Sequence, residues 1–212
     1  VSDTDLVEIP EGIDLKSATL ASNMETAINA IWDAEISLGD RVLIFGYGLI
    51  GGLIATIIRQ MTGIKVEVFE KDSNRQQLHV SHGIPTKSLN EYDVVFNATS
   101  NESALREALI LTRQEGRVIE LSWYGNRETT LQLGAEFHHG RKQIISSQVS
   151  QIPYKKQPFW NFDKRKQLVF DLLANLDFTH LLTDEVDFLD TPKFYDRLRK
   201  DKIKNLSTII CY

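Results

Sequence analysis

The stretch RVLIFGYGLIGGLIATIIRQ, residues 41–60, constrains the fold of this 212-residue chain more than any other segment. An apolar run leads into three spaced glycines, Gly46, Gly48 and Gly51, and a second apolar run follows. This is the G-x-G-x-x-G pattern of a strand that turns sharply into a helix. Gly46 permits the turn, Gly48 leaves its backbone open to a bound phosphate, and Gly51 lets the helix lie close to the strand.

We expect the start of that helix to form an anion site. The N–H groups around Leu49 and Ile50 have no partner within the helix and favour negative charge. The next predicted strand ends at Glu70, 19 residues after Gly51, where a carboxylate can accept hydrogen bonds from the hydroxyls of an adenosine ribose. The pattern therefore favours a dinucleotide site, and the alternative is a turn with a purely structural role.

The residues beside Glu70 bear on which dinucleotide would bind. A carboxylate at the ribose repels a 2′-phosphate, which favours NAD over NADP. Lys71 and Arg75 argue the other way, because either cation could reach such a phosphate. We expect NAD as the cofactor and keep NADP as the less favoured alternative.

Strands and helices alternate along the chain. Continuously apolar strands between helices predict an α/β fold, a doubly wound parallel sheet with helices on both faces. Strands are predicted at 41–45, 65–70, 93–100, 117–125, 143–148 and 207–212, and helices at 23–35, 49–61, 73–82, 103–111, 164–176 and 191–200. We expect residues 1–183 to form a dinucleotide-binding domain of the Rossmann type, to which residues 184–212 add a helix and a strand.

Residues at the carboxyl ends of the predicted strands are further site candidates, because ligands of open α/β sheets bind at this edge. Ala98, Thr99 and Ser100 end one strand, and we expect them near the ribose or the adenine. Ser122 and Trp123 end the next strand. We expect this pair to line a nicotinamide pocket, and the alternative is that Trp123 packs beneath that pocket.

The last strand of the predicted sheet ends at Ser147 and Gln148, which are expected to contact the nicotinamide carboxamide. His138 and His139 precede it. Neighbouring residues of a strand point to opposite faces, so this pair is a poor metal site and we interpret both as surface histidines. No catalytic residue is identified.

Composition argues against several function classes. The chain has 24 basic and 29 acidic residues, and a net charge of -5 does not favour a nucleic-acid or anionic-membrane surface. Its one cysteine, Cys211, fits a reducing cytoplasm and permits no internal disulfide. The N-terminus shows no secretion-signal pattern, and no apolar run reaches a membrane-spanning length. We expect a cytoplasmic protein with no nucleic-acid or membrane partner.

Nearly the whole chain resembles the nucleotide-binding, C-terminal portion of a medium-chain dehydrogenase/reductase of the zinc-type alcohol dehydrogenase superfamily. The family's helix, turn and glycine-rich strand resemble the segment LASNMETAINAIWDAEISLGDRVLIFGYGLIG. The family's segment from an acid to an arginine resembles VFEKDSNRQQLHVSHG, and bacterial members resemble the string ELSWYG…FHHGRKQIISSQ. The resemblance implies hydride transfer to or from a nicotinamide cofactor, an alcohol or carbonyl compound as small-molecule substrate, and a homodimer.

Two departures from the family change the expected function. The family's N-terminal catalytic domain, which holds most of the substrate pocket and any zinc, has no counterpart before the core, and the chain begins at Val1. We expect part of a larger enzyme, inactive alone, whose residues 184–212 return to that domain. The position of the family's zinc ligand holds Ser22, a poor ligand, so we expect this chain to bind no zinc. A stand-alone nucleotide sensor or interaction module, and a remnant that binds no nucleotide, are the alternatives.

Overall fold

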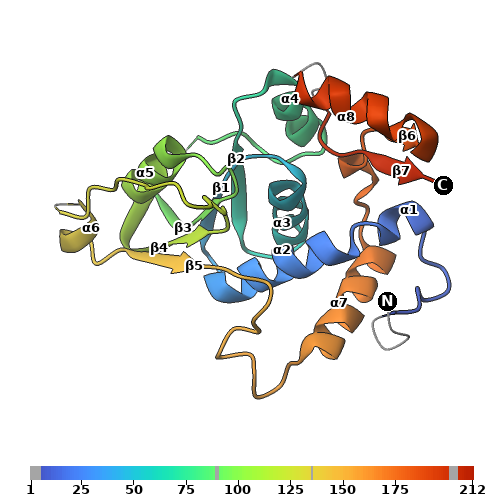
Figure 1. Cartoon of the computed structure of the whole chain (residues 1–212). Helices are drawn as coiled ribbons and strands as arrows, with labels where there is room; N and C mark the ends of the chain where they lie inside the picture. The colour runs from blue at the N-terminus through green and yellow to red at the C-terminus, as the bar shows by residue number, and fades with distance from the viewer. Residues whose placement is uncertain (1–5, 89–90, 135, 201–204) are drawn as a thin grey trace.

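A five-stranded parallel sheet forms the centre of the computed structural model, which describes residues 6–88, 91–134, 136–200 and 205–212 (Figure 1). Its strand order is β2-β1-β3-β4-β5, and every neighbouring pair is parallel. The strands are β1 (Arg41–Phe45), β2 (Lys65–Phe69), β3 (Tyr92–Asn97), β4 (Thr112–Glu120) and β5 (Gln143–Ser146). A parallel bridge from Val68 to Thr86 extends the sheet beyond β2. The predicted α/β fold with a Rossmann-type parallel sheet is confirmed.

Helices cover both faces of this sheet (Figure 1). One core lies between the sheet and the α2, α3 and α7 side, and a second lies between the sheet and α5. The helices are α1 (Leu15–Ala18), α2 (Ala21–Ala34), α3 (Leu49–Arg59), α4 (Ser73–Ser81), α5 (Glu102–Leu111), α6 (Glu136–His139), α7 (Phe162–Asn175) and α8 (Thr191–Arg199). Because both faces are covered, the four consecutive residues 42–45 of β1 are buried, which is why all four are apolar.

Two adjacent glycines let the first turn of α3 pack closely on its neighbours. A Cβ on Gly51 would lie 2.0 Å from the carbonyl oxygen of Gly46, so the helix meets the end of β1 only with glycine there. A Cβ on Gly52 would lie 2.6 Å from Leu181 Cδ2. Leu181 belongs to the 3-10 helix η2 (Thr179–Leu181), which leads into the C-terminal residues.

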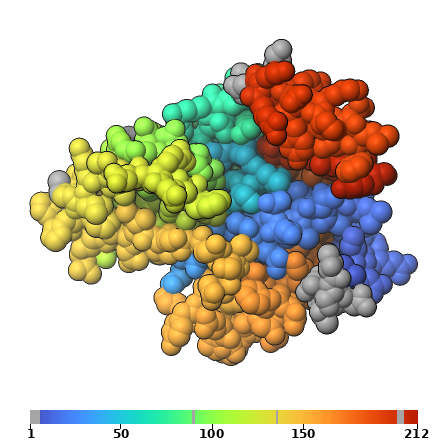
Figure 2. Space-filling model, in the orientation of Figure 1, coloured from blue at the N-terminus to red at the C-terminus, as the bar shows by residue number. Residues whose placement is uncertain are grey.

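The C-terminal residues form a small unit of their own. The strand β6 (Glu185–Asp187), the 3-10 helix η3 (Phe188–Asp190), α8 and β7 (Ile209–Cys211) follow one another, and β6 pairs with β7 in parallel. Figure 2 shows this unit as a lobe at one end of the molecule. The C-terminal strand thus has a partner within this chain, and the sequence analysis did not predict β6 because it is too short to be recognised from its sequence.

The predicted strand at 117–125 is also corrected. It begins earlier, at Thr112, which pairs with Tyr92, and it ends at Glu120. The chain leaves the sheet after Glu120 because Ser122 turns back toward it, its N–H donating to the Glu120 carboxylate at 2.7 Å.

Candidate functional site

The glycine loop has the geometry that its sequence predicts. Gly46 has φ +92°, and a Cβ there would lie 2.9 Å from Thr99 Cγ2, so the turn needs glycine. A Cβ on Gly48, in contrast, would meet a single protein atom within 4 Å, Arg75 Nη1 at 3.9 Å. The space in front of Gly48 is therefore open toward solvent, as the approach of a ligand to this backbone requires.

The N-terminus of α3 faces the same open space. The helix begins at Leu49 with Gly48 as its N-cap, and no side chain caps it. The N–H groups of the first turn, including those of Leu49 and Ile50, are thus left without helical acceptors, and the positive end of the helix dipole lies here. Backbone donors beside a position without a Cβ make a cradle suited to a phosphate group.

Glu70 has a second role besides the predicted one. Its carboxylate accepts hydrogen bonds from the backbone N–H groups of Tyr47 at 2.7 Å, Lys71 at 2.6 Å and Asp72 at 2.9 Å. Oε2 takes only the Tyr47 N–H, so it keeps a lone pair for a ribose hydroxyl. Glu70 therefore ties the end of β2 to the glycine loop in addition to facing the site.

A groove joins the glycine loop to Glu70 along the carboxyl ends of β1, β2 and β3. It has a volume of about 250 Å³ and lies where the strand order of the sheet reverses, which is the usual ligand position in such folds. Its lining residues are Phe45, Gly46, Gly48, Phe69, Glu70, Lys71, Arg75, Ala98, Thr99, Asn101 and Ala104.

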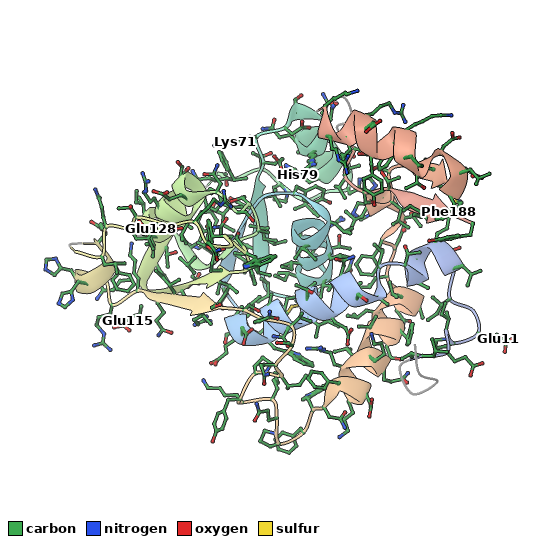
Figure 3. The ribbon with its side chains drawn as sticks, viewed as in Figure 1. Glu11, Lys71, His79, Glu115, Glu128 and Phe188 are labelled. Atoms are coloured by element: carbon green, nitrogen blue, oxygen red, sulfur yellow. The ribbon has the colours of Figure 1, made fainter. Side chains whose placement is uncertain are left out.

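Both predicted cations lie at this groove. Figure 3 labels Lys71, which follows β2. Arg75, in the first turn of α4, reaches the front of Gly48 and donates from Nη2 to the carbonyl of Asn205 at 3.4 Å. Arg75 therefore connects the groove to the C-terminal unit.

Ser122 and Trp123 do not line the groove. The Ser122 hydroxyl accepts from the N–H of Ser100 at 2.9 Å and donates to the carbonyl of Asn97 at 3.3 Å, which ties together the ends of β3 and β4. Trp123 is 88% exposed, so the alternative that it packs beneath a pocket is wrong.

Ser147 and Gln148 follow β5 at the same edge of the sheet. The Ser147 hydroxyl donates to the Asp33 carboxylate at 2.6 Å, and the Gln148 side-chain oxygen accepts from the N–H of Ser150 at 2.9 Å. The Ser147 hydroxyl and the Gln148 side-chain oxygen are thus used within the protein, whereas the backbone N–H of Gln148 has no acceptor among the described contacts.

Four groove residues, Phe45, Phe69, Asn101 and Ala104, are absent from the predicted site residues. Asn101 caps α5, since its side-chain oxygen accepts from the N–H groups of Ser103 and Ala104. An asparagine just before a helix is a recognisable N-cap signal. Combined with the rule that strand ends meet at one edge, this signal would have placed Asn101 at the site.

A partly buried cluster supports the glycine loop from behind. The Tyr47 hydroxyl lies 3.3 Å from His180 Nε2, and the ring of His180 stacks on that of His82 at 4.2 Å. Burial raises the pKa of Tyr47 to about 12 and lowers that of His180 to about 4. His79, labelled in Figure 3, is fully buried with Nδ1 2.8 Å from the carbonyl of Ile84, and its Nε2 has no partner among the described residues.

The two neighbouring histidines lie away from the groove. His138 and His139 belong to the short helix α6 and both are exposed, so the prediction that they are surface histidines is confirmed, although they lie on a helix rather than beside each other on a strand. Within the described ranges, no group of three or more histidine, cysteine, aspartate or glutamate side chains is arranged to hold a metal ion. The same ranges contain no helix long and apolar enough to cross a membrane.

Comparisons with known proteins give the relatives of this chain. No protein-family profile matches it. The D-guloside 3-dehydrogenase of Shigella flexneri is 22% identical over 213 residues, which cover 92% of this chain and 61% of that protein. The chain therefore spans less than two thirds of this curated relative.

Solved structures of dehydrogenases share the fold. An alcohol dehydrogenase from Escherichia coli CFT073, solved with NADH, has a TM-score of 0.82 at 17% identity over 100% of this chain and 64% of that one. A protein described as a zinc-binding dehydrogenase from Sinorhizobium meliloti 1021, bound to NADP, has a TM-score of 0.78 at 14% identity over 97% of this chain and 62% of that one. The resemblance drawn from the sequence is confirmed.

Proposed function

We propose that the chain is the nucleotide-binding portion of a medium-chain dehydrogenase/reductase and that it binds a nicotinamide dinucleotide along the carboxyl edge of its sheet. The observation that carries the proposal is the cradle at Gly48. A Cβ at this position would meet almost no protein atom, yet it would occupy the space in front of the α3 N-terminus. Such a site fits the pyrophosphate of a dinucleotide.

The preferred cofactor is NAD rather than NADP. The free lone pair of Glu70 Oε2 suits a ribose hydroxyl, and the negative charge disfavours a 2′-phosphate. Lys71 and Arg75 are the residues that would favour the phosphate, and one of the similar structures holds NADP. The discrimination therefore depends on how far the fixed carboxylate outweighs two cations at the same groove.

The reaction is hydride transfer between the nicotinamide and a small alcohol or carbonyl compound. The cofactor supplies this chemistry when it is bound, and this chain contributes the groove that orients it. The described residues offer no zinc site, so we derive no step through a metal. The substrate pocket belongs to another part of the enzyme, and this chain alone turns nothing over. Detectable oxidation of an alcohol by this chain would contradict that.

The partners of the chain follow from the same proposal. Residues 184–212 contact an N-terminal catalytic domain, supported by the short β6–β7 sheet, which alone is marginally stable. The enzyme is a homodimer that pairs through an edge of the main sheet, where β5 has one strand neighbour among the described residues. Its location is the cytoplasm, which is consistent with a single cysteine.

Titration of NADH into the protein, followed by nicotinamide fluorescence and repeated with NADPH, tests the proposal. Saturable binding that is tighter for NADH than for NADPH is expected. Binding of neither cofactor would contradict the proposal and favour a remnant with a structural glycine turn. Binding by a full-length protein that lacks catalytic activity would favour a nucleotide sensor instead.

A further inference from the structure

A buried arginine lies between α2, α7 and the segment that follows β5. Arg165 is 3% exposed, although most arginines keep their charge in water. Its Nη1 donates to the Asn29 side-chain oxygen at 2.9 Å and to the carbonyl of Val149 at 2.9 Å, and its Nε lies 3.4 Å from Glu25. These hydrogen bonds hold the buried guanidinium in one position, and they also fix the positions of the groups that accept them.

The same cluster holds three consecutive residues after β5. Arg165 binds the carbonyl of Val149, and Asn29 donates to the carbonyl of Gln148 at 3.3 Å. Asp33 accepts from the Ser147 hydroxyl at 2.6 Å and from the Asn29 amide at 3.2 Å. Beyond the last sheet hydrogen bond, which the Ser147 N–H makes, the segment 147–149 is thus fixed by side chains of α2 and α7.

This segment lies at the end of the carboxyl edge opposite the groove. The groove uses the ends of β2, β1 and β3, whereas residue 147 continues β5, its N–H donating to the carbonyl of Glu120 at 3.0 Å. A dinucleotide extended across the edge from the groove brings its second nucleotide toward β4 and β5. Among the described contacts the N–H groups of Gln148 and Val149 have no protein acceptor.

We propose that Arg165 is a positioning residue, which with Asn29 fixes the backbone of 147–149 where the nicotinamide half of the cofactor binds. The proposal rests on the proposed function, because it needs a dinucleotide at this edge. Arg165 lies on the α2 and α7 side and touches no groove residue in the contacts above. It therefore acts on the nicotinamide half and leaves the adenosine half unchanged.

Paired calorimetric titrations of NADH and ADP-ribose test this inference, since ADP-ribose has every group of the cofactor except the nicotinamide. In Arg165→Met we expect the Kd of NADH to rise about tenfold while that of ADP-ribose stays within about twofold. Loss of folded protein lowers the apparent affinity for both ligands alike, so the ratio of the two Kd values isolates positioning from stability.

Matched variants keep the test decisive. Lys166→Met removes the neighbouring cation, which pairs with Glu25 at 2.6 Å, and should leave the ratio unchanged. If Arg165→Met does not fold, Ser147→Ala removes another tether of the same segment and should raise the ratio about threefold. An unchanged ratio in the folded variants overturns the inference and leaves the proposed function standing. A wild-type protein that binds neither ligand overturns both.

Discussion

The two ends of the carboxyl edge are built in different ways. At the end formed by β2, β1 and β3, the backbone itself makes the site, through a glycine turn, a bare helix N-terminus and a carboxylate that accepts backbone N–H groups. At the β4 and β5 end, side chains from distant elements hold an irregular segment in place. The first end depends on local sequence, whereas the second depends on packing between helices that the sequence separates widely.

The largest expected effect comes from Gly51. In Gly51→Ala the new methyl group would lie 2.0 Å from the carbonyl oxygen of Gly46, and backbone must move to relieve the clash. We expect the free energy of unfolding to fall by about 3 kcal/mol or more, measured by urea denaturation. Gly134→Ala, where nothing lies within 4 Å of the added methyl, is the control. Equal midpoints for the two variants would show that α3 is not packed as described.

A substitution at Gly48 tests cofactor binding separately from folding. In Gly48→Val the side chain enters open space, so stability should change by less than about 0.5 kcal/mol. NADH affinity should fall about a hundredfold, because the valine occupies the phosphate position. Fluorescence titration beside urea denaturation checks both parts. Full retention of NADH binding would place the cofactor elsewhere.

Glu70 tests cofactor choice at the same end. Glu70→Gln removes the charge that disfavours a 2′-phosphate and leaves an amide facing backbone donors. We expect NADH affinity to fall about tenfold and NADPH affinity to fall less, or to rise. The ratio of the two Kd values in parallel titrations is the measurement, with Glu11→Gln as an exposed control. A ratio equal to that of the wild type would assign the preference to another residue.

The smallest effect is a pH dependence beneath the glycine loop. Burial lowers the pKa of His180 from 6.5 to about 4, so the unfolded chain binds more protons between these values. The contribution of the neutral His180 to the free energy of unfolding is fully present above about pH 6.5 and is lost as the pH falls toward 4. Allowing for partial exposure, the loss is about 1–2 kcal/mol, measurable as urea midpoints at pH 7 and pH 5. His180→Gln should reduce this pH dependence, and an unchanged slope would assign it to other groups.

The sequence predicts well the end of the carboxyl edge that β2, β1 and β3 form. The glycine spacing, Glu70 and Arg75 all meet at one groove, because a strand, a tight turn and a helix fix their own geometry within a short stretch. The central strands β1 and β3 were found for a related reason, since continuous apolar runs are required when both faces of a sheet are covered.

The β4 and β5 end of the carboxyl edge was not predictable by the same means. Arg165 and Asn29 lie 136 residues apart, and neither carries a spacing that reveals their contact. Trp123 looks like a pocket residue from its position after a strand, but the chain leaves the sheet at Glu120 and exposes it. Likewise β6 has three residues, and its strand character comes only from pairing with β7.

The contact between Gly52 and Leu181 has an evolutionary consequence. Position 52 lies just outside the glycine pattern, so that pattern places no demand on it, yet any side chain there would push against the side chain of Leu181 in η2. Substitutions at these two positions should therefore be correlated among descendants of a common ancestor. A lineage that acquires a larger residue at one position should show a smaller residue, or a shifted helix, at the other.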